Sequence, residues 1–206
     1  MKSEPYVITI GREYGSGGYE IGKRIAGSLG ISFYDKELLT LAAKKSGLSP
    51  ELFASADEKA AGKLSYALSA GFPFFGSLFS GGVTSDALFT IQSETILELA
   101  RKESFVIVGR CADYVLRNHP CCFNAFIHSP LSFRIERVMT RKPQSRQNVM
   151  DEIAKVDKER ANFYNFYSQK EWGRALSYHL CIDSSLFGID RTAQIVEGFA
   201  MEKLKR

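Results

Sequence analysis

Short apolar runs alternate along the chain with longer segments of mixed apolar and polar residues. The runs are rich in β-branched residues, as buried strands are; they are YVITI (6–10), ISFYD (31–35), SFVIVG (104–109), CFNAFIHS (122–129) and LCID (180–183). The segments between them predict helices over residues 19–29, 85–102, 130–142, 147–167 and 188–205. This alternation predicts an α/β fold in which helices cover both faces of a parallel sheet, with residues 6–10 as the central strand.

Composition narrows the class of protein. The chain of 206 residues is long enough for one compact domain with a sizeable core. Apolar residues make up 45% and charged residues 24%, as in ordinary folded proteins, which excludes a disordered or fibrous class. The formal charge of +4 is too small to indicate binding of duplex nucleic acid. A small anionic ligand suits this charge better, and we expect no nucleic-acid partner.

Two further patterns bear on the compartment. Residues 1–10 lack the charged-then-apolar pattern of a signal peptide, and no apolar stretch approaches the roughly 18 residues that span a bilayer. We therefore expect a cytoplasmic protein without membrane contact. The cysteines Cys111, Cys121, Cys122 and Cys181 form no CxxC pair and have no metal-binding spacing with the histidines. We interpret them as reduced residues that pack in the fold.

One segment fits neither a helix nor an ordinary loop. Residues 36–70 read as helices with several breaks, and GFPFFGSLFSGG (71–82) then places four phenylalanines among glycines and serines. The phenylalanines either pack onto the core or a partner subunit, which is compatible with a homodimer, or form a flap that closes over a ligand. The sequence leaves both interpretations open.

The first predicted strand leads into the glycine-rich stretch GREYGSGGYE (11–20), which leads into a helix. Such a turn binds phosphate because successive backbone N–H groups converge on the anion and the helix adds its positive N-terminal end. Gly11, Gly15, Gly17 and Gly18 permit this close backbone approach. A glycine-rich turn without any ligand is the simpler alternative.

The lysine of the common phosphate-loop pattern G-x-x-x-x-G-K-[ST] is missing. Gly11 and Gly17 fit that pattern, but Gly18 stands in place of the lysine and Tyr19 in place of the hydroxyl residue that holds the metal. Arg12 is the candidate replacement for the lysine because it lies in the loop itself.

The residues around the loop resemble a known protein family. The stretch VITIGREYGSGGYEIGKRIAGSLGISFYD (7–35) resembles the opening of the cytidylate kinase-like family, a divergent branch of the P-loop nucleoside monophosphate kinases. The resemblance continues in VIVGRCADYVL (106–116), IHSPLSFRIERVM (127–139), VDKERANFYNFY (156–167), KEWG (170–173) and LCIDSSLFGID (180–190).

This resemblance implies a three-layer α/β/α P-loop core built from one domain, residues 1–206. A small helical insertion for the nucleoside monophosphate would occupy about residues 40–95, and a lid about residues 140–170. ATP and Mg²⁺ would be the cofactors, although the resemblance does not define the metal ligands. The loop residues that would bind the nucleotide are Gly11, Arg12, Glu13, Tyr14, Gly15, Ser16, Gly17, Gly18 and Tyr19.

Arginines form the second candidate group. Arg134, Arg137 and Arg141 recur at three- and four-residue spacing along one stripe of a predicted helix, where they could clamp phosphates. The alternative is a solvated helix face paired with carboxylates. Arg137 and Arg141 resemble the lid helix of the family, and Asp157 and Arg160 resemble its lid stretch. Arg12, Arg137, Arg141 and Arg160 are thus the candidate catalytic residues.

The residues that would bind the acceptor substrate match the family less closely. Arg110 in VGRCAD matches the family, whereas Cys111 replaces its acidic residue and Asp113 lies two positions on. Asp35 follows a predicted strand and either shapes the acceptor site or caps the next helix. The arginine that follows in cytidylate kinases falls at about Leu41 here. The candidate substrate-binding residues are Asp35, Arg110, Asp113, Arg134 and Asp157.

These observations favour a phosphotransferase that uses ATP to phosphorylate CMP, dCMP or a related acceptor. A nucleotide-sensing protein on a degenerate kinase scaffold is the first alternative, because loss of the lysine would impair transfer more than binding. A kinase with a non-nucleotide small-molecule acceptor is the second, because a fold does not fix its substrate.

Overall fold

The computed structural model describes residues 4–35 and 85–204. The expected helical insertion therefore lies mostly outside the described residues. The same holds for the phenylalanine-rich segment 71–82 and for Leu41.

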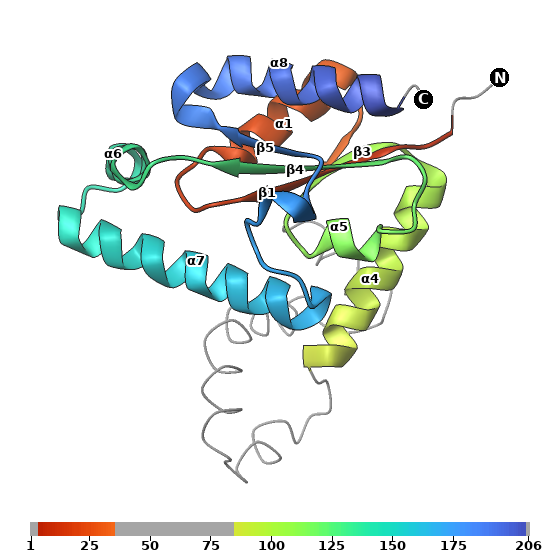
Figure 1. The fold of residues 1–206 in the computed structure, drawn as a ribbon, viewed down its shortest axis with the longest axis horizontal. Coiled ribbons are helices and arrows are strands. Elements are labelled where there is room, and N and C mark those ends of the chain that lie inside the picture. Colours follow the sequence, from red (N-terminus) through yellow and green to blue (C-terminus); the bar gives the residue numbers. More distant parts are fainter. Residues whose placement is uncertain (1–3, 36–84, 205–206) are drawn as a thin grey trace, which may run out of the picture.

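A parallel sheet forms the centre of the described chain (Figure 1). Its strands are β1 (Val7–Arg12), β2 (Ser32–Tyr34), β3 (Phe105–Val108), β4 (Cys122–His128) and β5 (Leu180–Asp183). They lie in the order β2-β3-β1-β4-β5, which confirms the first strand as the central one. Val7 aligns with Phe105 on one side and with Cys122 on the other.

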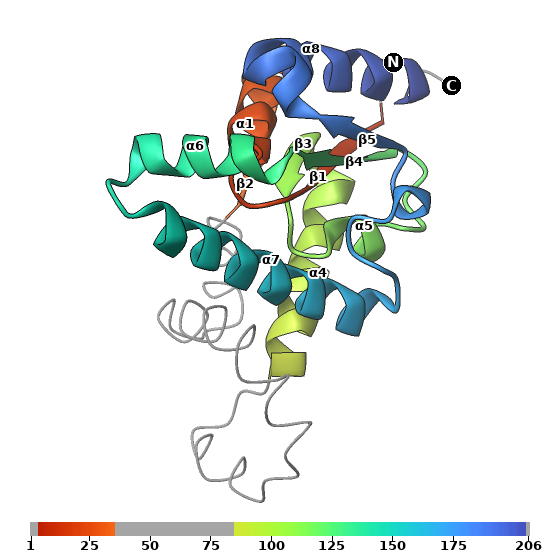
Figure 2. The ribbon, with the colours of Figure 1, turned by 60° about the vertical axis from the view of Figure 1, so that its left-hand side comes forward.

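Helices cover both faces of this sheet, which confirms the α/β prediction. They are α1 (Gly18–Leu29), α4 (Ser85–Lys102), α5 (Ala112–Val115), α6 (Leu131–Arg141), α7 (Arg146–Ser168) and α8 (Ser184–Leu204), with a short 3-10 helix at Ala175–Ser177. Helices α1 and α8 lie on one face, and α4 and α5 on the other, with α7 crossing below them (Figures 1 and 2).

The alternation of side chains along β1 produces two cores. Ile8 and Ile10 are fully buried in a cluster with α1 and α8. Val7 points to the opposite face, where it packs in a cluster with Ile96 of α4 and Ile107 of β3. The inner strands β1 and β3 are thus buried on both faces, which is why VITI and FVIV are nearly continuous apolar runs. The edge strands β2 and β5 are only partly buried.

The bounds of two elements, β1 and the last helix, differ by more than one residue from the sequence prediction. Strand β1 continues through Gly11 and Arg12, which pair with Phe126 and Ile127 of β4, so the loop begins only at Glu13. The last helix begins at Ser184 and contains a break at Gly188, where φ is 68° and ψ is 176°. Glycine tolerates that left-handed φ at little cost.

All four cysteines are free thiols, which agrees with their expected role in packing. Within residues 4–35 and 85–204, no helix combines the length and the hydropathy needed to cross a lipid bilayer.

Candidate active site

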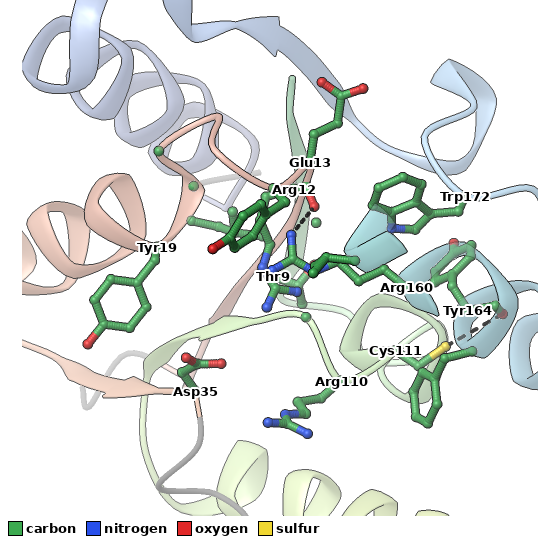
Figure 3. Close-up of a pocket in the computed structure, with 18 of the residues that line it drawn as sticks. Thr9, Arg12, Glu13, Tyr19, Asp35, Arg110, Cys111, Arg160, Tyr164 and Trp172 are labelled. Carbon is green, nitrogen blue, oxygen red and sulfur yellow. Dashed lines mark hydrogen bonds between the residues drawn. The ribbon is translucent and has the colours of Figure 1, made fainter. Parts of the chain in front are cut away.

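A pocket of about 450 Å³ lies at the carboxyl ends of β1 and β3, between the glycine-rich loop and α7 (Figure 3). Open α/β sheets place their ligands at this edge. Most of the candidate site residues line it, namely Gly11, Arg12, Glu13, Tyr14, Gly15, Gly17, Gly18, Tyr19, Asp35, Arg110, Asp113, Arg141 and Arg160. Ser16, Arg134, Arg137 and Asp157 do not line the pocket.

The loop has the backbone geometry of an anion site. Gly15 and Gly17 adopt left-handed conformations, with φ of 84° and 88°, and α1 begins at Gly18. The backbone N–H groups of Gly15, Gly17 and Gly18 have no hydrogen-bond partner within the described part of the chain. Unpaired N–H groups at the start of a helix are ready hydrogen-bond donors to phosphate oxygens.

Ser16 stabilises the loop through hydrogen bonds. Its side chain is fully buried, and its hydroxyl donates to the carbonyl oxygen of Glu13 at 2.9 Å. The carbonyl oxygen of Ser16 accepts from the hydroxyl of Ser184 at 2.6 Å. These bonds hold the turn against the start of α8.

Arg12 occupies the space beside Gly18. A Cβ atom added at Gly18 would lie 2.5 Å from the Cβ of Arg12, and one added at Gly109 would overlap the Arg12 guanidinium. The Arg12 side chain therefore runs from the end of β1 past the start of α1 to the end of β3. A lysine at position 18 would collide with it, so the arginine and the usual lysine exclude each other.

Two more arginines reach the same pocket. Arg12, Arg110 and Arg160 all line it. Figure 3 shows the side chains of Arg12 and Arg160 close together, with Arg110 further along the pocket and Asp35 on the side of β2. Arg160 of α7 donates from Nη1 to the carbonyl oxygen of Arg12 at 3.1 Å, and its guanidinium lies 5.6 Å from the ring of Tyr14. Burial lowers the pKa of Arg160, while the carboxylates of Asp157 and Asp35 raise it. An arginine remains charged under such conditions.

The arginine stripe of α6 lies on one face, as its spacing implied, and that face packs against the loop. Two of its members contact protein groups outside the pocket. The Nε of Arg137 donates to the carbonyl oxygen of Gly15 at 3.1 Å. The Nη1 of Arg134 lies 2.5 Å from Oδ2 of Asp157. Arg141 lines the pocket and forms an ion pair with Glu20.

Arg134 and Asp157, which the sequence suggests as acceptor-binding residues, do not line the pocket. The alternative for Arg134 was a solvated helix face, but it is 9% exposed. Asp157 accepts a hydrogen bond from the backbone N–H of Tyr14 at 2.7 Å. Both residues therefore lie behind the loop, where α6 and α7 pack on the outer side of the turn.

Cys111 lies close to a buried polar pair, Asp113 and Tyr164. Cys111 has a φ of 55°, and its thiol lies 3.9 Å from the carbonyl oxygen of Tyr164. The hydroxyl of Tyr164 donates to Oδ2 of Asp113 at 2.7 Å. Burial raises the pKa of Asp113, and the hydrogen bond from Tyr164 opposes that shift. Asp113 thus brings a hydrogen-bonded carboxyl group to the pocket wall.

Aromatic residues form one end of the pocket. Trp172 and Tyr178 line it and pack on Phe126 of β4, with ring centroids 5.2 and 4.9 Å apart. Trp172 belongs to the stretch KEWG (170–173), which carries part of the family resemblance, and the sequence suggests packing for it, or less favourably a surface on which a base stacks. Tyr178 and Thr9 of β1 also line the pocket, but no sequence pattern placed them there, because they come together only when the segment after α7 folds back over the sheet.

The sequence of the chain matches a known protein family. The sequence model of the cytidylate kinase-like family matches residues 7–186. The chain belongs to the cytidylate kinase-like family. The match covers every described strand of this cytidylate kinase-like protein and the helices up to the first residues of α8. No curated protein matches the chain.

Solved structures share the fold of this family member. A protein described as uncharacterized, from Eubacterium ventriosum ATCC 27560, is 27% identical, with a TM-score of 0.72; the alignment covers 95% of this chain and 98% of that one. A shikimate kinase from Bacteroides thetaiotaomicron is 14% identical, with a TM-score of 0.51 and coverage of 98% and 99%. A gluconokinase from Sinorhizobium meliloti 1021 is 16% identical, with a TM-score of 0.50 and coverage of 100% and 94%. The fold is that of P-loop kinases.

Proposed function

We propose that this chain transfers the γ-phosphoryl group of ATP to a nucleoside monophosphate, with CMP and dCMP as the first candidates. The observation that carries the proposal is that one pocket is lined by Arg12, Arg110 and Arg160 and by the loop glycines, whose N–H groups are unpaired among the described residues. Phosphoryl transfer needs alignment and charge neutralisation more than covalent chemistry from the protein. Family membership supports the same conclusion.

The residues divide by role. The N–H groups of Gly15, Gly17 and Gly18 would bind the β- and γ-phosphates of ATP, and Arg12 would neutralise charge where the lysine normally does. Arg110 and Arg160 would hold the acceptor phosphate in line with the γ-phosphate. The acceptor oxygen then bonds to the γ-phosphorus while the bond to the β–γ bridging oxygen breaks, and ADP leaves.

The pocket also suits magnesium. Mg²⁺ usually binds one or two carboxylates together with substrate phosphates and waters, and Asp35 brings a carboxylate to the pocket. Within the described residues, no cluster of three or more His, Cys, Asp or Glu forms a metal site of its own. Bound Mg²⁺ would neutralise phosphate charge and orient the γ-phosphate.

The test is product formation. The purified protein is incubated with Mg-ATP and CMP, dCMP, UMP, AMP or GMP, and the products are separated by chromatography. A diphosphate product from CMP or dCMP is expected. ATP binding without any product would favour a nucleotide sensor, and ATP hydrolysis that no nucleotide stimulates would favour a non-nucleotide acceptor; either result would contradict the proposal.

A further inference from the structure

Tyr14, the central residue of the glycine-rich loop, is held from outside by α6 and α7. Its N–H donates to Oδ1 of Asp157 at 2.7 Å, and its carbonyl oxygen accepts from Nη1 of Arg134 at 3.3 Å. Its hydroxyl donates to Oε1 of Glu152 at 2.8 Å. The guanidinium of Arg160 lies 5.6 Å from its ring. Both polar groups of the Tyr14 backbone are therefore paired on the side away from the pocket.

Arg134 and Asp157 link these contacts into one buried network. Nη1 of Arg134 binds Oδ2 of Asp157 at 2.5 Å, and its Nε lies 3.4 Å from Oε2 of Glu13, an ion pair without hydrogen-bond geometry. Glu13 also accepts from the N–H of Ser129 at 3.0 Å. The Arg134 and Asp157 side chains are only 10% and 15% exposed, so each charge depends on its partner for solvation.

Three carbonyl groups of the loop are also held from outside by arginines. Arginines of α6 and α7 bind the carbonyl oxygens of Arg12, Tyr14 and Gly15 at 3.1, 3.3 and 3.1 Å. Because a peptide unit is planar, fixing a carbonyl outward directs the N–H of the next residue inward. The N–H of Gly15, which follows the carbonyl of Tyr14, is one of the loop's unpaired donors among the described residues.

We propose that Asp157, acting through Arg134 and the Tyr14 backbone, is a positioning residue that aims the N–H of Gly15 at the phosphates of the bound nucleotide. The N–H groups of Glu13 and Ser16, which follow the other two fixed carbonyls, donate to the carbonyl oxygens of Ile127 and Glu13 instead. The inference rests on the proposed function in placing a phosphate chain at the loop. It gives α7 a second role, since the helix that carries Arg160 into the pocket also sets the direction of this loop donor. Asp157 itself touches no substrate.

Asp157→Asn tests this role, because the amide keeps the shape of the side chain and loses the charge. Binding of Mg-ADP and of inorganic tripolyphosphate is measured by calorimetry, well below the unfolding temperature. We expect both to bind 10-fold or more weakly, by the same factor, with CMP affinity changed less than twofold. Asp151→Asn is the matched control, because Asp151 lies exposed on the same helix and pairs only with Gln147 among the described residues; it should bind like the parent.

A contact of Asp157 with the acceptor predicts the opposite pattern, in which CMP binds more weakly and tripolyphosphate binds normally, and this would overturn the inference. Unchanged affinity for all three ligands would overturn it as well. If Asp157→Asn does not fold, Arg134→Lys decides, because a lysine keeps the positive charge beside Asp157 but lacks the planar guanidinium that binds both Asp157 and the carbonyl oxygen of Tyr14. We then expect tripolyphosphate to bind two- to fivefold more weakly, and an unchanged affinity would refute the inference. Since these measurements need no turnover, a parent protein that binds tripolyphosphate but makes no product would contradict the kinase proposal alone.

Discussion

At the scale of single residues, the side chain of Arg12 requires a glycine at position 18. The start of α1 has no room for a side chain at position 18 while Arg12 lies across it. The positive charge has therefore moved from the helix to the end of β1. A charge six residues earlier in the sequence can serve the same phosphates only because strand and helix meet at this point.

Arg12→Gln should lower kcat at least about 100-fold, because it removes the charge that replaces the lysine, a loss comparable to removing one transition-state donor. Steady-state assays with Mg-ATP and CMP measure the effect. Arg191→Gln on α8 is the control, since Arg191 is exposed and bonds Gln194. Equal activity of the Arg12 variant and the parent would show that another group neutralises the phosphates.

The buried pair of Asp113 and Tyr164 predicts a pH-dependent stability. Burial raises the pKa of Asp113, so the folded protein resists its ionisation and loses stability as the pH rises from the ordinary aspartate pKa, about 3.9, through the raised one. Asp113→Asn keeps an acceptor for the Tyr164 hydroxyl and cannot ionise. Urea unfolding between pH 4 and 8 should show the variant gaining stability relative to the parent as the pH rises; a constant difference would contradict the prediction.

At the scale of elements, the turn between β1 and α1 depends on glycines for two separate reasons. Gly17 has a φ of 88°, which disfavours any side chain. A Cβ atom there would also overlap the side chain of Ile189 in α8. The phosphate loop is thus shaped by the helix behind it as well as by its own sequence.

Gly17→Ala should lower the free energy of unfolding by about 1–3 kcal/mol, because it combines a left-handed φ with a steric overlap. Gly27→Ala, in the exposed part of α1, should raise it by about 0.5–1 kcal/mol, because nothing lies within 4 Å of the added methyl group and alanine favours a helix. Chemical denaturation compares the two variants with the parent. A destabilised Gly27→Ala would show that α1 is more constrained than its surroundings indicate.

At the scale of the whole molecule, the pocket joins segments that are far apart in the chain. The loop, the end of β3 and α7 all contribute to it, so a ligand that bridges them stabilises the folded state as a unit. Saturating Mg-ADP at 100 times its dissociation constant should add about 2.7 kcal/mol.

For a domain of this length, that gain corresponds to a rise in melting temperature of about 5–10 °C. A thermal scan with and without Mg-ADP measures it, with adenosine as the control that lacks phosphates. An equal rise with adenosine, or none with Mg-ADP, would contradict phosphate binding at the loop.

The sequence determined the described strands, the long helices and the loop, but not the short helices at Ala112–Val115 and Ala175–Ser177. Strands such as SFVIVG are continuous apolar runs because both faces of the sheet are covered, and the helix predicted over 85–102 agrees with α4. Gly15 and Gly17 marked the turn of the loop, because a left-handed backbone conformation is a local property that glycine favours. The spacing of Arg134, Arg137 and Arg141 likewise fixed their common helix face.

The tertiary structure decided what each charged side chain meets. Asp157 and Tyr14 are 143 residues apart, and no spacing in the sequence indicates that one accepts a hydrogen bond from the other. The arginine stripe could have faced phosphate or protein, and only the packing of α6 against the loop turned Arg134 toward protein groups and left Arg141 at the pocket. The spacing of residues predicts which side chains share one face of a helix. Which groups those side chains contact depends on how distant segments of the chain pack together.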